Sequence, residues 1–63
     1  MNHDTETFAF SGTIHARTAK AILIEWMPDQ QDWFPLSQVL EIHGDPHAEI
    51  VVSAWIAKKK GLI

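Results

Sequence analysis

Short apolar segments that alternate with a period of two, separated by turn-forming residues, constrain the fold of this chain most strongly. The clearest is residues 18–27, where Ile22, Ile24 and Trp26 fall on one face of an extended backbone. Such alternation is typical of a β-strand that buries one face. The pattern therefore predicts a protein built mainly of β-strands.

Four further segments have strand character. They are residues 6–16, 32–34, 39–43 and 48–52. The first also contains Ser11 and Gly12, where a bulge or bend is expected because glycine weakens a regular strand. The segments are separated by a hairpin turn at 28–31, a tight turn at 36–38 and a loop at 44–47. Pro35 has no N–H to donate, so the strand at 32–34 should end there or lie at a sheet edge.

The C-terminal part has the pattern of one short helix. Ser53 is a favourable N-cap, residues 54–60 are good helix formers, and Gly61 occupies the position of a left-handed C-cap. The lysines in the last turn complement the helix dipole. The helix is expected to be held against the domain by three apolar residues: Trp55, Ile56 and Leu62.

The size of the chain allows one domain. A protein of 63 residues buries only about 60% of its unfolded surface. There is no cysteine, which excludes a disulfide and a thiolate metal site. We predict a flexible N-terminal tail at residues 1–5 and a single domain at 6–63, folded as a mainly β, five-stranded, SH3-like barrel with a short C-terminal α-helix. An OB-fold is less favoured, because it usually needs a longer chain and a helix between its middle strands.

Residues 32–38 (Asp-Trp-Phe-Pro-Leu-Ser-Gln) concentrate the binding chemistry of the chain. Trp33 and Phe34 point to opposite faces of one strand, so one is expected in the core and the other at a contact surface. A barrel this small seldom buries three indoles completely, and partly exposed aromatics are typical of protein interfaces. The predicted partner-binding residues are Trp33, Phe34, Ser37, Gln38 and Trp26.

Charge is distributed unevenly. Residues 1–52 hold all eight acidic residues and only two basic ones, a formal charge of −6, whereas residues 53–63 carry +3. An acidic body repels nucleic acid at long range. Lys58, Lys59 and Lys60 are interpreted as the solvated end of the helix, with phosphate contact as the alternative.

No residue pattern indicates catalysis or a cofactor. Three side chains, those of His43, Asp45 and His47, have metal-ligand chemistry in close spacing. A solvated turn that uses Gly, Asp and Pro for their backbone preferences is the favoured interpretation, because no fourth ligand is evident. Ser37 lacks a neighbouring base and a Gly-rich elbow. Glu25 and Asp32 are candidates to face each other across the hairpin, as solvated acids. We predict a protein that is not an enzyme and binds no metal or cofactor.

Three separated segments resemble a group of small, largely uncharacterised proteins of phages, prophages and other mobile elements. The segments are 20–24 (Lys-Ala-Ile-Leu-Ile), 33–38 (Trp-Phe-Pro-Leu-Ser-Gln) and 51–62, which ends in Trp-Ile-Ala-Lys-Lys-Lys-Gly-Leu. Phe34 replaces the usual Ile of the Trp-Ile-Pro-x-Ser-Gln box, and the turn at 28–31 lacks the Gly common there. The resemblance implies a phage or mobile-element accessory protein and carries over no catalytic residue.

Two hypotheses about function follow. The favoured one is a protein-binding module that modulates a host or phage protein, for example by inhibiting a host defence complex. The alternative is an accessory that binds single-stranded nucleic acid, with bases stacked on aromatics and phosphates held by Lys58, Lys59 and Lys60. Self-assembly as a homodimer through an open sheet edge is a third. No signal peptide or membrane span is recognisable, so a cytoplasmic location is expected.

Overall fold

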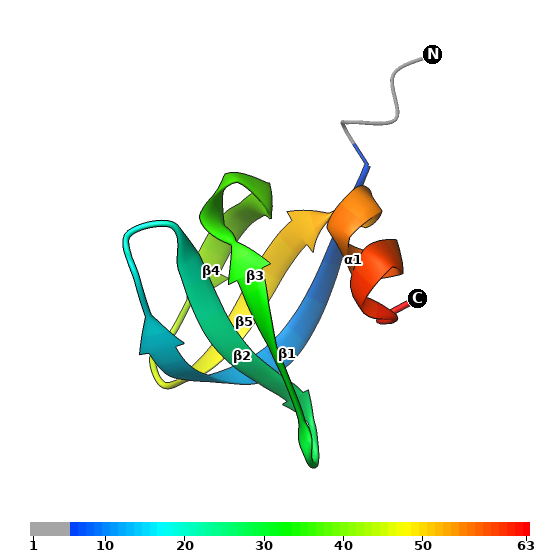
Figure 1. The fold of residues 1–63 in the computed structure, drawn as a ribbon. Helices are drawn as coiled ribbons and strands as arrows, with labels where there is room; N and C mark the ends of the chain where they lie inside the picture. The colour runs from blue at the N-terminus through cyan, green and yellow to red at the C-terminus, as the bar shows by residue number, and fades with distance from the viewer. Residues whose placement is uncertain (1–5) are drawn as a thin grey trace.

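The computed structural model describes residues 6–63 and contains five β-strands and a C-terminal helix (Figure 1). The elements are β1 (Thr7–Arg17), β2 (Ala21–Met27), β3 (Gln30–Pro35), the 3₁₀ turn η2 (Leu36–Gln38), β4 (Val39–His43), β5 (His47–Ser53) and α1 (Ala54–Lys60). The predicted helix and four of the predicted strands are present within one or two residues of their expected ends. The strand expected at 18–27 begins three residues later, at Ala21, because Thr18 and Ala21 close a turn through their hydrogen bonds. The predicted tail at 1–5 lies outside the described residues.

The strands form one antiparallel sheet in the order β3-β2-β1-β5-β4. The central strand β1 serves both halves of this sheet, since residues 7–13 pair with β5 and residues 13–17 pair with β2. In Figure 1, β2 and β3 cross in front of β1 and β5. β3 and β4 are the free edges, so the sheet is open and closure into a barrel is not observed.

The core is formed by the inward-facing residues of the strands together with the helix. Ile22 and Ile24 of β2, Phe34 of β3, and Ile50 and Val52 of β5 are completely buried. Along each strand these residues alternate with more exposed ones, as expected for a sheet with one solvated face. Period-two patterning therefore predicted the buried face correctly.

Three register shifts interrupt the ladders. They occur between Ile14 and Ala16, between Glu25 and Met27, and between Val39 and Glu41. The residues inserted between these pairs are His15, Trp26 and Leu40. No bulge occurs at Ser11 and Gly12 in the ladder with β5, where the pairing of β1 continues unbroken from Thr7 to Thr13. A bulge bends its strand and increases the local twist, so these insertions shape the sheet.

The helix is capped as predicted but packs differently. Ser53 Oγ accepts a hydrogen bond from Ile56 N–H, and Gly61 has a φ of 84°. Ile56 and Ala57 face the core, and Leu62 packs against it. The expectation that Trp55 fixes the helix is wrong, because its side chain is 58% exposed. With Ile56 and Ala57 directed inward, the preceding residue lies about 100° round the helix and faces solvent.

Candidate functional site

Trp33 and Phe34 occupy opposite faces of the edge strand β3. Phe34 is completely buried and its ring lies 5.8 Å from that of Phe10, whereas Trp33 is 43% exposed. The expectation that one faces inward and the other outward is therefore confirmed. Phe34, which the sequence also placed among the partner-binding residues, is a core residue with no surface to offer a partner.

Trp33 belongs to an apolar row on the outer face of the sheet. Its register partner on β2 is Leu23, and the partner of Leu23 on β1 is Ala16. We call Ala16, Leu23 and Trp33 the Trp33 row. Pro35 and Ala21 form the next cross-strand pair on the same face, toward the end of β3. Because β3 is a sheet edge, the row ends in an exposed indole beside an unpaired strand.

Trp26 lies away from this row, at the bulge where β2 leaves β1. It is partly buried, and its enclosed indole N–H has no hydrogen-bond partner among residues 6–63. Together with its neighbours it forms one wall of a groove with a cavity volume of about 670 Å³. The groove is lined by residues 11–13, 25–28 and 47–49 and by His43. We call it the β1 groove, because residues 11–13 of β1 run along it.

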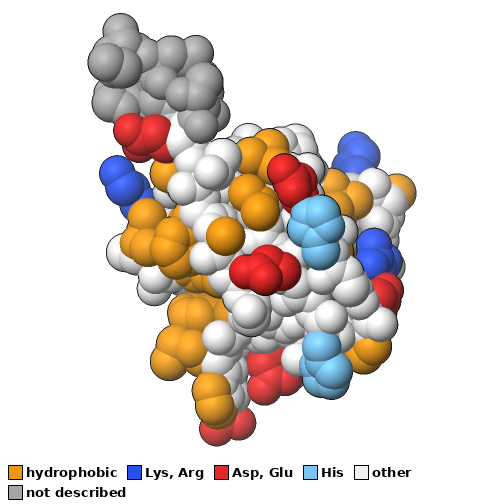
Figure 2. All heavy atoms as spheres, turned by 180° about the vertical axis from the view of Figure 1, so that it is seen from behind, with side chains coloured by type: hydrophobic (Ala, Val, Ile, Leu, Met, Phe, Trp, Pro, Cys, Tyr) orange, Lys and Arg blue, Asp and Glu red, His pale blue; other side chains and the backbone are white. Residues whose placement is uncertain are grey.

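The groove has acidic and apolar lining residues. Glu25 and Glu49 contribute carboxylates, and Trp26, Met27 and Pro28 contribute apolar surface. None of the described Lys or Arg residues lines the groove. Figure 2, which shows the molecule from behind, has acidic side chains and imidazoles across its middle and Lys and Arg only toward its margins. This distribution favours a ligand of positive charge.

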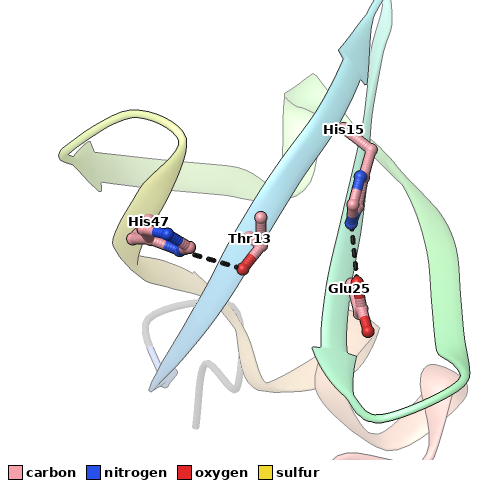
Figure 3. Close-up of polar contacts among 4 residues, drawn as sticks. All are labelled: Thr13, His15, Glu25 and His47. Atoms are coloured by element: carbon pink, nitrogen blue, oxygen red, sulfur yellow. Dashed lines mark hydrogen bonds and ion pairs between the residues drawn. The ribbon is translucent and has the colours of Figure 1, made fainter.

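Two cross-strand contacts hold the polar side chains near the groove in place (Figure 3). His15 Nε2–H donates to Glu25 Oε1 over 2.7 Å, and a hydrogen bond of 3.2 Å joins Thr13 Oγ1 to His47 Nδ1. These pairs link β1 to β2 and to β5. The Glu25 carboxylate is therefore already engaged, whereas the Glu49 side chain makes no hydrogen bond or ion pair within residues 6–63.

The lysines at the end of α1 are mostly engaged within the domain. Lys60 Nζ lies 3.9 Å from Asp32 Oδ1 and 5.9 Å from the centroid of the Phe34 ring. Lys59 Nζ lies 5.2 Å from the centroid of the exposed Trp55 ring. Of the three predicted phosphate-contacting lysines, only Lys58 is free of such contacts within the described residues.

Ser37 and Gln38 of the aromatic box have different positions. Ser37 is exposed on η2, whereas Gln38 is half-buried and accepts a hydrogen bond of 2.5 Å from Ser53 Oγ–H. Since Ser53 also caps α1, this contact ties the helix to the 3₁₀ turn. Gln38 therefore has a structural role that its position in the box did not reveal.

Replacement of Ser53 by alanine is expected to lower the free energy of unfolding by about 1–2 kcal/mol. The change removes the cap of α1 and leaves the half-buried Gln38 carbonyl without its donor, which adds a desolvation cost. Urea denaturation followed by circular dichroism measures the loss. Ser53→Thr keeps a hydroxyl and should recover most of it; equal losses for the two variants would contradict the capping role.

The candidate metal and acid–base groups are dispersed. His43 Nε2–H donates to Glu41 Oε1 over 2.7 Å, and Arg17 holds Asp45 at 2.9 Å. Within residues 6–63 no three His, Cys, Asp or Glu side chains are grouped so as to hold a metal ion. The expectation that two acids face each other across the hairpin is wrong: Asp32 pairs with the buried Ile24, so it lies on the opposite face from Glu25.

The exposure of several surface residues was not predicted from the sequence. Trp55, Met27 and Leu40 are each more than half exposed, and Glu49 is a free acid in the β1 groove. For Trp55 a signal existed, because burial of Ile56 and Ala57 turns the preceding side chain outward. The others depend on bulges and strand pairing, which period-two patterning does not reveal.

Comparison with known proteins adds no relative: no protein-family model, curated protein or solved structure matches the chain. Over the described residues, no helix has the length and apolar character that crossing a membrane requires.

Proposed function

We propose that this protein is a non-enzymatic binding module that docks on another protein through the Trp33 row and thereby modulates it. The observation that carries the proposal is the 43% exposed indole of Trp33, held in an apolar cross-strand row at a sheet edge. Tryptophan is enriched among the residues that dominate binding energy at protein interfaces. An edge strand also offers unpaired backbone groups to a partner.

The resemblance to phage and mobile-element proteins extends this proposal to the partner. A host or phage protein is the expected target, and inhibition of a host defence complex is one concrete form. In this proposal the domain is a small SH3-like β-fold in the cytoplasm whose activity depends on surface contact. The net charge of −3 favours a target with a basic surface.

Replacement of Trp33 by alanine should weaken partner binding by about 30-fold or more, the effect of losing a central aromatic anchor. The partner is first captured from a lysate of the native host on the immobilised protein and identified. Its affinity for the purified wild type and variants is then measured by calorimetry. Circular dichroism should show the variant folded, since Trp33 lies outside the core.

Trp55→Ala is the matched control, because Trp55 is an even more exposed indole located on α1. It should leave the affinity unchanged within about two-fold, the scale of near-neutral interface positions. Equal weakening by both substitutions, or full binding by Trp33→Ala, would refute the Trp33 row as the docking surface.

The nucleic-acid alternative has less support. Lys59 is placed over Trp55 and Lys60 beside Asp32, which leaves little free positive charge on an acidic domain. Titration of a single-stranded oligonucleotide at low salt tests it directly. Tight binding that falls steeply with salt and is lost on substitution of Lys58, Lys59 and Lys60 by alanine would favour this alternative over protein docking.

A further inference from the structure

The β1 groove runs beside a stretch of strand that has a neighbour on one side only. Residues 7–13 of β1 pair with β5, but β2 pairs with β1 only from Thr13 onward. The last β1–β2 pair is Thr13 and Glu25, and the β2–β3 ladder shifts register directly beyond it, at Trp26. Among the described residues, positions 7–11 of β1 therefore have no β2 neighbour on the side away from β5.

Backbone geometry indicates which residues point toward this side of β1, which we call its open edge. Ile14 N–H donates to Pro46 O over 2.7 Å, and Ala54 N–H donates to Glu6 O over 2.9 Å, so even-numbered residues of β1 face the β5 side. In an antiparallel strand, alternate residues direct their N–H and C=O groups to opposite sides. Since pairing with β5 is unbroken here, Ala9 and Ser11 present theirs to the open edge. Ser11 also lines the groove.

The charge and polarity of the groove indicate the side chains of an occupant. Glu49 is an exposed carboxylate that no described residue neutralises, and Glu25 lies across the groove from it on β2. Trp26, Met27 and Pro28 provide an apolar wall, with Met27 more than half exposed. An extended segment that alternates basic and apolar side chains complements both features.

We propose that the β1 groove binds an extended basic segment of the partner protein, which adds as a strand to the open edge of β1 at Ala9 and Ser11. A Lys or Arg side chain of that segment pairs with Glu49, and its apolar neighbours contact Trp26 and Met27. This inference rests on the proposed function. It adds to the contact at Trp33 a second contact, which recognises the amino-acid sequence of the partner segment.

A titration monitored by nuclear magnetic resonance tests the groove with defined probes. The probe is the peptide acetyl-Val-Lys-Val-Lys-Val-amide, and acetyl-Val-Glu-Val-Glu-Val-amide is its charge-reversed counterpart. The lysine peptide should shift the backbone amides of Ala9 and Ser11 and the indole N–H of Trp26. The glutamate peptide should produce no such shifts, and N-methylation of the central Val of the lysine peptide should abolish binding by removing a strand donor.

Glu49→Gln should weaken binding of the lysine peptide by about two- to five-fold and reduce its salt dependence, as expected for one exposed ion pair. Glu41→Gln is the matched control, since Glu41 is an exposed acid on the neighbouring β4 that does not line the groove. Equal binding of both peptides, shifts clustered away from the groove, or equal weakening by the two variants would overturn the proposal.

The outcomes for the groove and for the Trp33 row are separable. Trp33→Ala should leave the affinity for the lysine peptide unchanged, because Trp33 does not line the groove. If Trp33→Ala no longer binds the partner and the wild type does not bind the lysine peptide, only the proposal for the β1 groove is refuted. If the wild type binds the lysine peptide and Trp33→Ala still binds the partner fully, only the proposal that the Trp33 row is the docking surface is refuted.

Discussion

Phe34→Ala is expected to lower the free energy of unfolding by about 3–5 kcal/mol, the cost of removing a buried phenylalanine from a packed core. Phe34 is the largest of the completely buried side chains, and it packs against Phe10. Lys60 also lies over its ring, so the substitution loosens a contact between β3 and α1. A loss of this size approaches the whole stability of a small domain.

Thermal and urea denaturation followed by circular dichroism measure this effect. Trp33→Ala, one residue earlier on the same strand, is the control and should cost less than about 1 kcal/mol because its side chain is largely solvated. Phe34→Leu keeps most of the buried volume, so its loss of unfolding free energy should lie between those of the other two variants. It therefore tests the role of Phe34 even where Phe34→Ala does not fold. Similar costs for Trp33→Ala and Phe34→Ala would contradict the assignment of their faces.

Gly12→Ala should lower the free energy of unfolding by about 1–3 kcal/mol through overpacking. A Cβ at this position would lie 2.6 Å from Ile24 Cγ2 and 3.0 Å from the backbone oxygen of Glu25. Both neighbours belong to β2 where it crosses β1, and Ile24 is completely buried, so neither can move aside freely. Gly12 is thus required for the close approach of these two strands.

A double-mutant cycle separates this contact from a general effect of losing a glycine. Ile24→Ala removes the methyl group that the new Cβ would meet, so the combined loss with Gly12→Ala should be smaller than the sum of the single losses by at least about 0.5 kcal/mol. Gly61→Ala is the control, because its Cβ would meet nothing within 4 Å and only its φ of +84° is strained. Its effect should add to that of Ile24→Ala. Additive effects at Gly12 would contradict the close approach.

Local sequence patterns predict some features of the candidate binding surfaces and not others. Alternation along β3 correctly predicted that one of Trp33 and Phe34 faces solvent and the other faces the core, because neighbouring residues of a strand face opposite sides. It did not predict which one is buried. That choice follows from the register with β2, which aligns Phe34 with the buried Ile22 and Trp33 with Leu23 on the outer face.

The β1 groove was beyond prediction from the sequence for a related reason. It depends on the register shift at Trp26, on the point at which β2 leaves β1, and on Glu49 of a strand far along the chain. Each of these is a property of pairing between segments, and a bulge leaves no periodic signature of its own. The acidic composition could be seen in the sequence. The position of acidic residues around a groove that no described Lys or Arg lines could not be predicted from it.

By itself the sequence determined the number and approximate limits of the strands, most of the turns between them and both caps of the helix. These features depend on contacts within a few residues: the alternation of side chains, the missing N–H of Pro35, the hydroxyl of Ser53 and the left-handed backbone of Gly61. Only the tertiary structure decided that the sheet stays open, that Trp33 and Trp55 are exposed and that a groove lies beside β1. The reason is physical, since burial and pairing are set by residues distant in the chain, and local preference carries no information about which of them meet.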